Sequence, residues 1–83
     1  MGEAILVDIQ IAALSMRIDA QVPLHVPVED IMRRILGWAS QQFACPLSAE
    51  ERFLCNVRTG EILMGSQCLY RSRILPGDHL ILF

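Results

Sequence analysis

Residues 26–43, VPVEDIMRRILGWASQQF, carry the helical hydrophobic pattern of the chain and decide its fold. Pro27 suits a first helical turn, and Glu29 and Asp30 lie near its positive N-terminal end. No Ser, Thr, Asp or Asn stands at the N-cap position, so the first helical residue stays open. Pro46 ends the segment. We expect one amphipathic helix of about fifteen residues, with an apolar stripe made of Val28, Ile31, Met32, Ile35, Leu36, Trp38, Ala39 and Phe43.

Two alternating segments precede this helix. In residues 4–11 the odd positions are apolar, whereas Asp8 and Gln10 face the other way. Residues 16–25 repeat the alternation with a cleaner contrast. The residues between the two segments are small or weakly polar, so we predict a hairpin. Pro23 cannot donate to a hydrogen-bond ladder, which predicts that the second strand lies at a sheet edge.

The part that follows the helix is predicted to be mostly strand. Residues 52–57 and 61–64 are strand candidates, and residues 79–83 form a last strand after the turn at 76–78. Two strands, a helix and further strands predict an α+β fold, a β-grasp roll whose first and last strands pair in parallel at the centre. We expect a mixed sheet of roughly four or five strands on one helix, in a single domain over residues 1–83.

Composition argues against several classes of protein. The formal net charge of -2 lacks the basic surface that a nucleic-acid-binding domain needs. No uninterrupted apolar run exceeds four residues, whereas a membrane helix needs about twenty. We therefore expect a soluble cytoplasmic protein without direct membrane insertion. Lysine is absent, which excludes Schiff-base chemistry and a P-loop lysine.

No group of side chains has the spacing of a metal or catalytic site. Cys45, Cys55 and Cys68 stand ten and thirteen residues apart, which suits neither a disulfide framework nor a zinc site. Cys68, Asp78 and His79 contain the residue types of a nucleophile set, but their spacing does not orient the thiol toward the imidazole. We expect no enzymatic activity, no catalytic residue, no metal and no cofactor.

Three other polar features have two interpretations each. Glu50-Glu51 precedes a strand and is interpreted as a solvated loop rather than an acid–base pair. His25 is predicted on the outward face of an edge strand, where a solvated imidazole needs no ligand. Residues 70–73, Tyr-Arg-Ser-Arg, form either a contact to an acidic partner or a solvated loop, since arginine binds carboxylates in a bidentate manner.

The sequence resembles ubiquitin, and more specifically the small YukD/EsaB ubiquitin-like proteins of type VII (ESX/WXG100) secretion systems. The resemblance rests on Val26–Ile31 at the start of the helix, Glu51–Leu54 at the third strand, and Leu69, Ile74 and Gly77–Leu80 before and in the last strand. It covers nearly the whole chain and implies the β-grasp fold. In related systems the same fold is fused to the N-terminus of a polytopic membrane component, and this chain resembles a free version of that module.

Conjugation is not expected from this resemblance. A covalent modifier or sulfur carrier of the same fold needs a flexible C-terminal tail that normally ends in two glycines. Here the sequence ends at Phe83 in a predicted strand, and YukD-like proteins similarly lack the diglycine and are regarded as non-conjugating. The absence of lysine agrees, because no chain of modifiers can be built on this protein.

Alternation also leaves apolar side chains on the outer face of the predicted sheet. If Phe53 and Cys55 point inward, their neighbour in the third strand points to solvent. The β-grasp order places the first, last and third strands side by side, so one exposed apolar patch is expected, made of Leu6, Leu54, Ile81 and Phe83. In ubiquitin the corresponding face is the main recognition surface. Docking of a partner, formation of a homodimer and the absence of any function remain the alternatives for this face.

The resemblance and the patch together lead to a functional hypothesis. The chain is expected to be a non-enzymatic adaptor or regulatory component of a bacterial type VII secretion system, and to dock onto membrane-embedded machinery. The alternative is a small ubiquitin-like auxiliary subunit of a multicomponent enzyme such as a diiron monooxygenase, which packs on the catalytic subunit and holds no metal itself.

Overall fold

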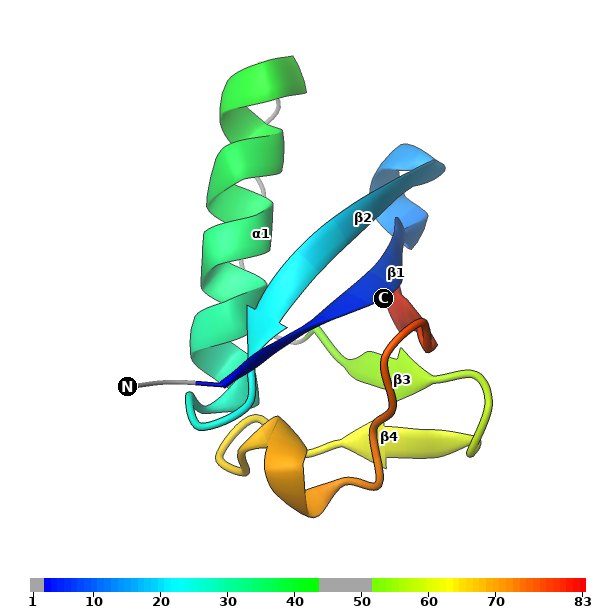
Figure 1. Ribbon diagram of the computed structural model, residues 1–83. Coiled ribbons are helices and arrows are strands. Elements are labelled where there is room, and N and C mark those ends of the chain that lie inside the picture. The colour runs from blue at the N-terminus through cyan, green and yellow to red at the C-terminus, as the bar shows by residue number, and fades with distance from the viewer. Residues whose placement is uncertain (1–2, 44–51) are drawn as a thin grey trace.

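A computed structural model describes residues 3–43 and 52–83 (Figure 1). In chain order its elements are β1 (Ala4–Ile11), the 3-10 turn η1 (Ala12–Leu14), β2 (Met16–Pro23), α1 (Val28–Phe43), β3 (Leu54–Asn56), β4 (Glu61–Leu63), the 3-10 turn η2 (Leu69–Arg71) and β5 (His79–Leu82). The strands form one five-stranded sheet in the order β2-β1-β5-β3-β4, and α1 packs on one face of it. The predicted α+β β-grasp roll is thereby confirmed.

The centre of the sheet is the parallel pair of β1 and β5. In their register Ile9 lies beside Leu80, as the β-grasp order predicts. On the other side of β1, β2 pairs antiparallel over its whole length, and Pro23 stands at the end of this edge strand. η1 makes the hairpin connection, and Ser15 leaves it with a left-handed backbone at φ 50°. Both the hairpin and the edge position were predicted from the sequence alone.

The first turn of α1 is capped by another part of the chain. The backbone N–H of Val28 donates to the carbonyl of Gln67 over 2.9 Å, and that of Glu29 donates to the carbonyl of Gly65 over 2.9 Å. The first N–H groups of a helix have no partner inside the helix. Here the loop between β4 and η2 supplies their acceptors, which explains why no capping side chain is needed in the sequence.

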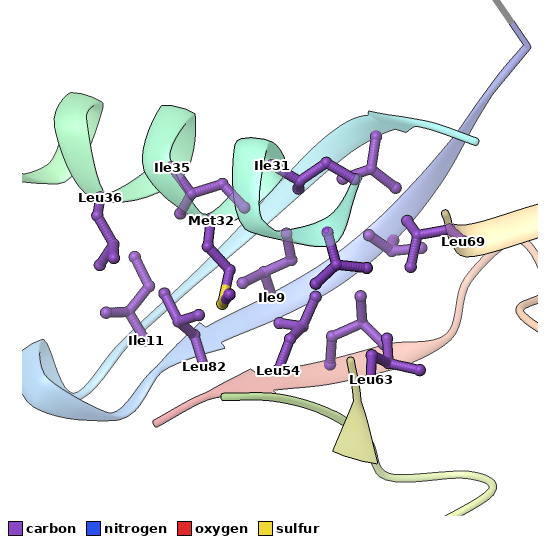
Figure 2. Close-up of a cluster of buried hydrophobic side chains, with 14 of the residues drawn as sticks. Ile9, Ile11, Ile31, Met32, Ile35, Leu36, Leu54, Leu63, Leu69 and Leu82 are labelled. Atoms are coloured by element: carbon purple, nitrogen blue, oxygen red, sulfur yellow. The ribbon is translucent and has the colours of Figure 1, made fainter. Parts of the chain in front are cut away.

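The core fills the space between α1 and the sheet (Figure 2). The inward positions of β1 and β5 meet the apolar stripe of the helix, and Leu69 of η2 closes one end, fully buried. Burial of apolar area contributes about 25 cal/mol per Å², so this cluster is the main source of stability. Among the described residues its members are Val7, Ile9, Ile11, Val22, Val28, Ile31, Met32, Ile35, Leu36, Ala39, Leu54, Leu63, Leu69, Leu80 and Leu82.

Two expectations about apolar side chains were wrong. Leu54 is 0% exposed and lies between Leu63 and Leu82 in the core, so it is no part of an outer patch. Phe53 and Cys55 were expected to point inward, but Phe53 is exposed and Leu54 is the buried residue. The inward and outward faces of β3 are therefore the reverse of the prediction, and we call this assignment of faces the phase of β3. Trp38, expected in the apolar stripe that the helix buries, is an exposed side chain of α1.

Some sequence-based expectations fall on other parts of the chain. Cys45, Pro46 and the pair Glu50-Glu51 lie outside the described residues. Within residues 3–43 and 52–83, no helix is both long and apolar enough to cross a membrane.

Candidate functional site

The face of the sheet opposite α1 carries a cluster of apolar side chains, which we call the sheet patch. Because Leu54, Leu63 and Leu82 are buried under the helix, their neighbours in the same strands point to the other face. These neighbours come from β3, β4 and β5 and from the residues that flank them. The sheet patch consists of Phe53, Cys55, Ile62, Ile81 and Phe83.

Strand register brings the members of the sheet patch together. Cys55 lies opposite Ile81 on one side and opposite Ile62 on the other. Next to this row, the N–H of Phe83 donates to the carbonyl of Phe53 over 2.9 Å, and the reverse bond is 3.4 Å. Directly opposed residues have Cβ atoms about 5 Å apart, so the five side chains form one continuous surface.

The sheet patch is open to solvent at its periphery. Phe53, Ile62 and Phe83 are 55%, 60% and 54% exposed, and Cys55 and Ile81 at the centre are half-buried. Single exposed apolar residues are common on soluble proteins, whereas a contiguous group of this kind usually marks a contact surface.

The other half of the same face is polar. On β1 and β2, Asp8 forms an ion pair with Arg17, and Asp19 lies directly opposite Asp8. The Arg17 guanidinium donates to the Asp8 carboxylate and lowers the pKa of that carboxyl below its usual value. Along β1 the sheet patch is therefore bordered by polar side chains, with Gln10 opposite Ile81 and Asp8 beyond it, and these limit how far an apolar contact can extend.

Leu6, predicted as a patch member, lies on the same face but apart from the patch. It is 52% exposed, and its carbonyl accepts a 2.7 Å bond from the N–H of Gly77 at the entry to β5. The row formed by Asp8 and His79 separates it from Ile81. Of the four predicted contact residues, the structure brings Ile81 and Phe83 together, separates Leu6 and buries the fourth.

His79 adds an unusual polar atom to this border. Its Nε2 is buried, and no hydrogen-bond partner is found for it among the described residues. Buried polar atoms are almost always paired with protein or water. His79 Nε2 is an exception among the described residues, and because the atom is buried it is not open to a partner at this surface.

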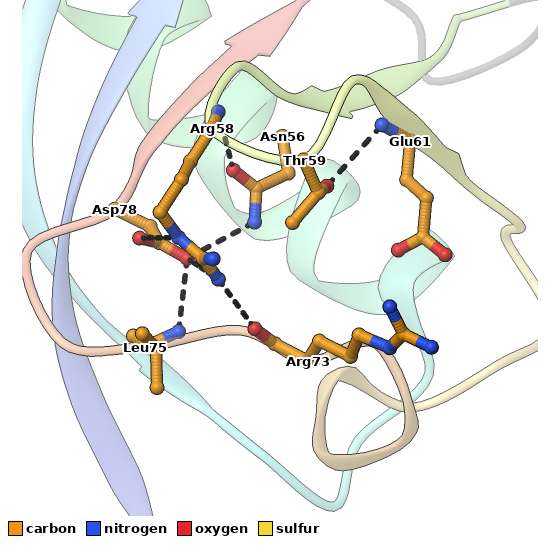
Figure 3. Close-up of polar contacts among 7 residues, drawn as sticks. All are labelled: Asn56, Arg58, Thr59, Glu61, Arg73, Leu75 and Asp78. Carbon is orange, nitrogen blue, oxygen red and sulfur yellow. Dashed lines mark hydrogen bonds and ion pairs between the residues drawn. The ribbon is translucent and has the colours of Figure 1, made fainter.

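A buried polar network fixes the strands that carry the sheet patch (Figure 3). The Asp78 carboxylate accepts bonds from Arg58 Nε at 2.8 Å, Asn56 Nδ2 at 3.0 Å and the Leu75 N–H at 2.9 Å. Arg58 Nη2 also donates to the Arg73 carbonyl over 2.6 Å. The network thus ties the β3–β4 turn to the loop that enters β5.

Electrostatics of this network favour the ionised carboxylate. The hydrogen bonds from Arg58 act most strongly, helped by the Leu75 N–H and Asn56, and together they outweigh burial and lower the pKa of Asp78 to about 2. Asn56 is itself fully buried and satisfied, because its Oδ1 accepts from the Arg58 N–H at 3.0 Å. A carboxylate held in this way is structural.

The candidate nucleophile set is not assembled. The backbone of Cys68 pairs with that of Pro27 in an isolated β-bridge beside the start of α1. His79 lies beside Asp8 in the sheet. Asp78, the third candidate, is bound by Arg58. In the described parts of the chain, no three His, Cys, Asp or Glu side chains are grouped so that they could hold a metal ion.

Sequence reasoning missed three members of the sheet patch: Phe53, Cys55 and Ile62. Around β3 both faces are largely apolar, since Phe53 and Cys55 alternate with Leu54, and alternation cannot say which set is inside. Asn56 shares the inward face with Leu54, although an amide is rarely found at a buried position. Nothing in the residues around Asn56 indicates that its hydrogen-bond partner, Asp78, is buried as well.

Comparisons with known proteins agree on the fold and point to one family. A family model described as WXG100 protein secretion system (Wss), protein YukD, matches residues 6–82. A search of curated proteins found no match. Among solved structures, a protein designed on the basis of ubiquitin is similar with a TM-score of 0.70 and 19% identity, over 96% of this chain and 87% of that chain.

Two other solved structures are similar over nearly the whole of this chain. A chain of the MycP5-free ESX-5 inner membrane complex has a TM-score of 0.75 and 23% identity, over 96% of this chain but only 20% of that chain. The EccD5 ubiquitin-like domain from Mycobacterium xenopi has a TM-score of 0.69 and 24% identity, over 98% of this chain and 93% of that chain. At these identities the likeness shows a shared fold.

Proposed function

The chain belongs to the YukD family of the WXG100 protein secretion system, and from that premise we propose that it is a non-enzymatic component that docks onto the membrane-embedded secretion machinery. The observation that carries this proposal is the sheet patch. Five apolar side chains on three neighbouring strands lie on the face that α1 leaves uncovered. Such a surface is suited to burial against another protein.

The nature of the partner is inferred from the structural neighbours. One of them is part of a larger chain in an ESX-5 inner membrane complex, and this chain matches 20% of its length. A domain with the same fold would be suited to bind machinery of the same kind. Its action would be mechanical or regulatory, through occupancy of a surface, and it would work without conjugation.

The border of the sheet patch adds specificity to the proposed contact. Asp8 and Arg17 form an ion pair on one side, and Gln10 of β1 lies directly opposite Ile81. An apolar centre with a polar rim is the usual anatomy of a protein interface. We expect the partner surface to be apolar at its centre and to offer hydrogen-bonding groups opposite β1.

The test is affinity capture from a native lysate in which membranes have been solubilised with detergent. Phe53→Glu with Phe83→Arg removes both phenyl rings but places opposite charges across the strand pair, so the sheet is preserved. The matched control is Leu6→Glu, which charges the same face outside the sheet patch. Circular dichroism and thermal unfolding verify that both variants are folded.

We expect mass spectrometry to identify membrane components of the secretion system with wild type and with the Leu6 variant, but not with the double variant. Equal recovery by all three baits would rule out the sheet patch as the docking site. Recovery of an oxygenase subunit instead would replace the secretion role by that of an auxiliary enzyme subunit. If light scattering finds a dimer for wild type but not for the double variant, the sheet patch is used for self-association.

A further inference from the structure

A second exposed surface lies away from the sheet patch, around η2. It combines aromatic and cationic side chains, and we call it the loop surface. Tyr70 and Arg71 belong to η2, Arg73 follows it, and His25 comes from the turn that leads from β2 to α1. All four side chains belong to exposed residues. The contacts among them suggest a prepared binding site rather than a freely solvated loop.

The backbone under the loop surface is held in place. Leu69 is fully buried in the core, and Ser72 is buried with its Oγ donating to the Leu69 carbonyl over 2.6 Å. The Tyr70 N–H donates to the Leu24 carbonyl over 3.2 Å, which joins the loop to the turn that carries His25. Anchoring of this kind lowers the entropy that a binding surface loses when it is occupied.

The side chains of the loop surface also position one another. The rings of His25 and Tyr70 lie with centroids 4.9 Å apart and planes tilted by 32°. Arg71 Nε donates to Tyr70 Oη over 3.0 Å, and the guanidinium carbon lies 5.5 Å from the ring centroid. Because Nε is the engaged atom, the two terminal nitrogens of Arg71 remain available as donors to an incoming acceptor.

Charge pairing distinguishes this surface from three of the other arginines. Three arginines are paired with a carboxylate: Arg17 with Asp8, Arg33 with Asp30 and Arg58 with Asp78. For the guanidinium groups of Arg71 and Arg73, the described part of the chain supplies no carboxylate partner. The Arg73 backbone is fixed as well, with a left-handed φ of 56° and its carbonyl bound by Arg58.

We propose that the loop surface binds an acidic peptide segment of a partner protein. The planar fork of arginine matches the two oxygens of a carboxylate, and the exposed ring of Tyr70 offers an apolar contact beside it. Proteins are attracted to anionic lipid by polybasic clusters of roughly four to eight basic residues. The loop surface has only two arginines. An acidic peptide therefore fits this surface better than a membrane does.

The experiment uses the full chain and the fluorescein-labelled peptide GEELEEG, with GQQLQQG as the uncharged comparison. Fluorescence anisotropy at low ionic strength measures affinity, and amide chemical shifts report where the peptide binds. The variant Arg71→Gln with Arg73→Gln removes two positive charges from the loop surface. The matched control, Arg33→Gln with Arg34→Gln, removes the same charge from exposed positions of α1.

We expect GEELEEG to shift the amide signals of Tyr70, Arg71 and His25, and GQQLQQG to leave them unchanged. The loop variant should bind about tenfold more weakly or worse, since charge-assisted bidentate bonds are lost. The α1 variant should remain within about twofold of wild type, because its charges lie elsewhere. Arg71→Lys should also weaken binding, because lysine keeps the charge but loses the fork.

Three results would overturn the proposal. They are no shift at the loop surface, equal weakening by both double variants, or binding to phosphatidylserine vesicles with no response to GEELEEG. The last result would reassign the surface to membrane contact. The outcome is independent of the proposed function, because Phe53→Glu with Phe83→Arg leaves the loop surface intact and should bind GEELEEG like wild type.

Discussion

Phe53 and Phe83 lie directly opposite each other where β3 and β5 meet at one end of the sheet, and their backbones exchange two hydrogen bonds of 2.9 and 3.4 Å. Their rings stand on the face that α1 does not cover, more than half exposed. The pair therefore fixes the register of β5 against β3 and forms one end of the sheet patch. A change in these two side chains can be made without disturbing the core.

This register predicts a difference between two double variants. Phe53→Glu with Phe83→Arg places opposite charges across the strands, whereas Phe53→Glu with Phe83→Glu places like charges there. Opposed like charges destabilise an antiparallel pair, and opposite charges stabilise it, so we expect the second variant to be less stable by about 0.5–1 kcal/mol. Urea denaturation measures the difference, and equal midpoints at low salt would contradict the register.

The inward phase of β3 predicts unequal costs for two neighbouring truncations. Leu54→Ala should destabilise the protein by about 2–5 kcal/mol, because it leaves a cavity in a site that is 0% exposed. Phe53→Ala should cost about 1 kcal/mol or less, since most of that ring is already in water. The free energy of unfolding in denaturant checks both values. If Phe53→Ala lowers the free energy of unfolding more than Leu54→Ala does, the assignment of Leu54 to the buried face of β3 is wrong.

Protonation of Asp78 predicts the pH dependence of stability. The folded-state pKa of about 2 lies below the ordinary value of 3.8, so the unfolded chain binds more protons between these values. The contribution is therefore fully present above pH 3.8 and is lost as the pH falls through about 2. Its size is about 2 kcal/mol.

Asp78→Asn is the matched variant for this titration. It is less stable than wild type at neutral pH, because Arg58 loses its charged partner, but its stability should fall less between pH 4 and about pH 2. Both curves share the slope due to Asp8, whose pKa Arg17 lowers, so the difference isolates Asp78. If the stability of both proteins falls equally with pH, other carboxyl groups are responsible for the loss of stability in acid.

Two glycines predict opposite effects of the same substitution. Gly37 is an exposed helical residue with nothing within 4 Å of an added Cβ, so Gly37→Ala should stabilise α1 by about 0.5–1 kcal/mol. Gly60 closes the β3–β4 turn at φ 72°, where a Cβ is strained, and Gly60→Ala should cost about 1 kcal/mol or more. Thermal unfolding distinguishes the two. A shift of the same sign in both would contradict the turn conformation.

Much of the fold could be predicted because its signals are local. Val7, Ile9 and Ile11 alternate with polar residues, so a strand buried on one face was evident. The helical stripe and the order of elements then led to the β-grasp roll. The sheet patch was only half predictable, because β3 is apolar on both faces and alternation alone gives no direction for Leu54.

The sequence by itself determined which segments are strands and helix and which faces of β1, β2 and α1 are buried, since these follow from the period of apolar residues. Tertiary structure decided the phase of β3, because Asn56 turns inward to bind Asp78 across the sheet. It also decided where α1 begins, since the capping carbonyls of Gly65 and Gln67 come from a distant loop. Contacts between residues far apart in the chain leave no periodic trace, so only the folded arrangement reveals them.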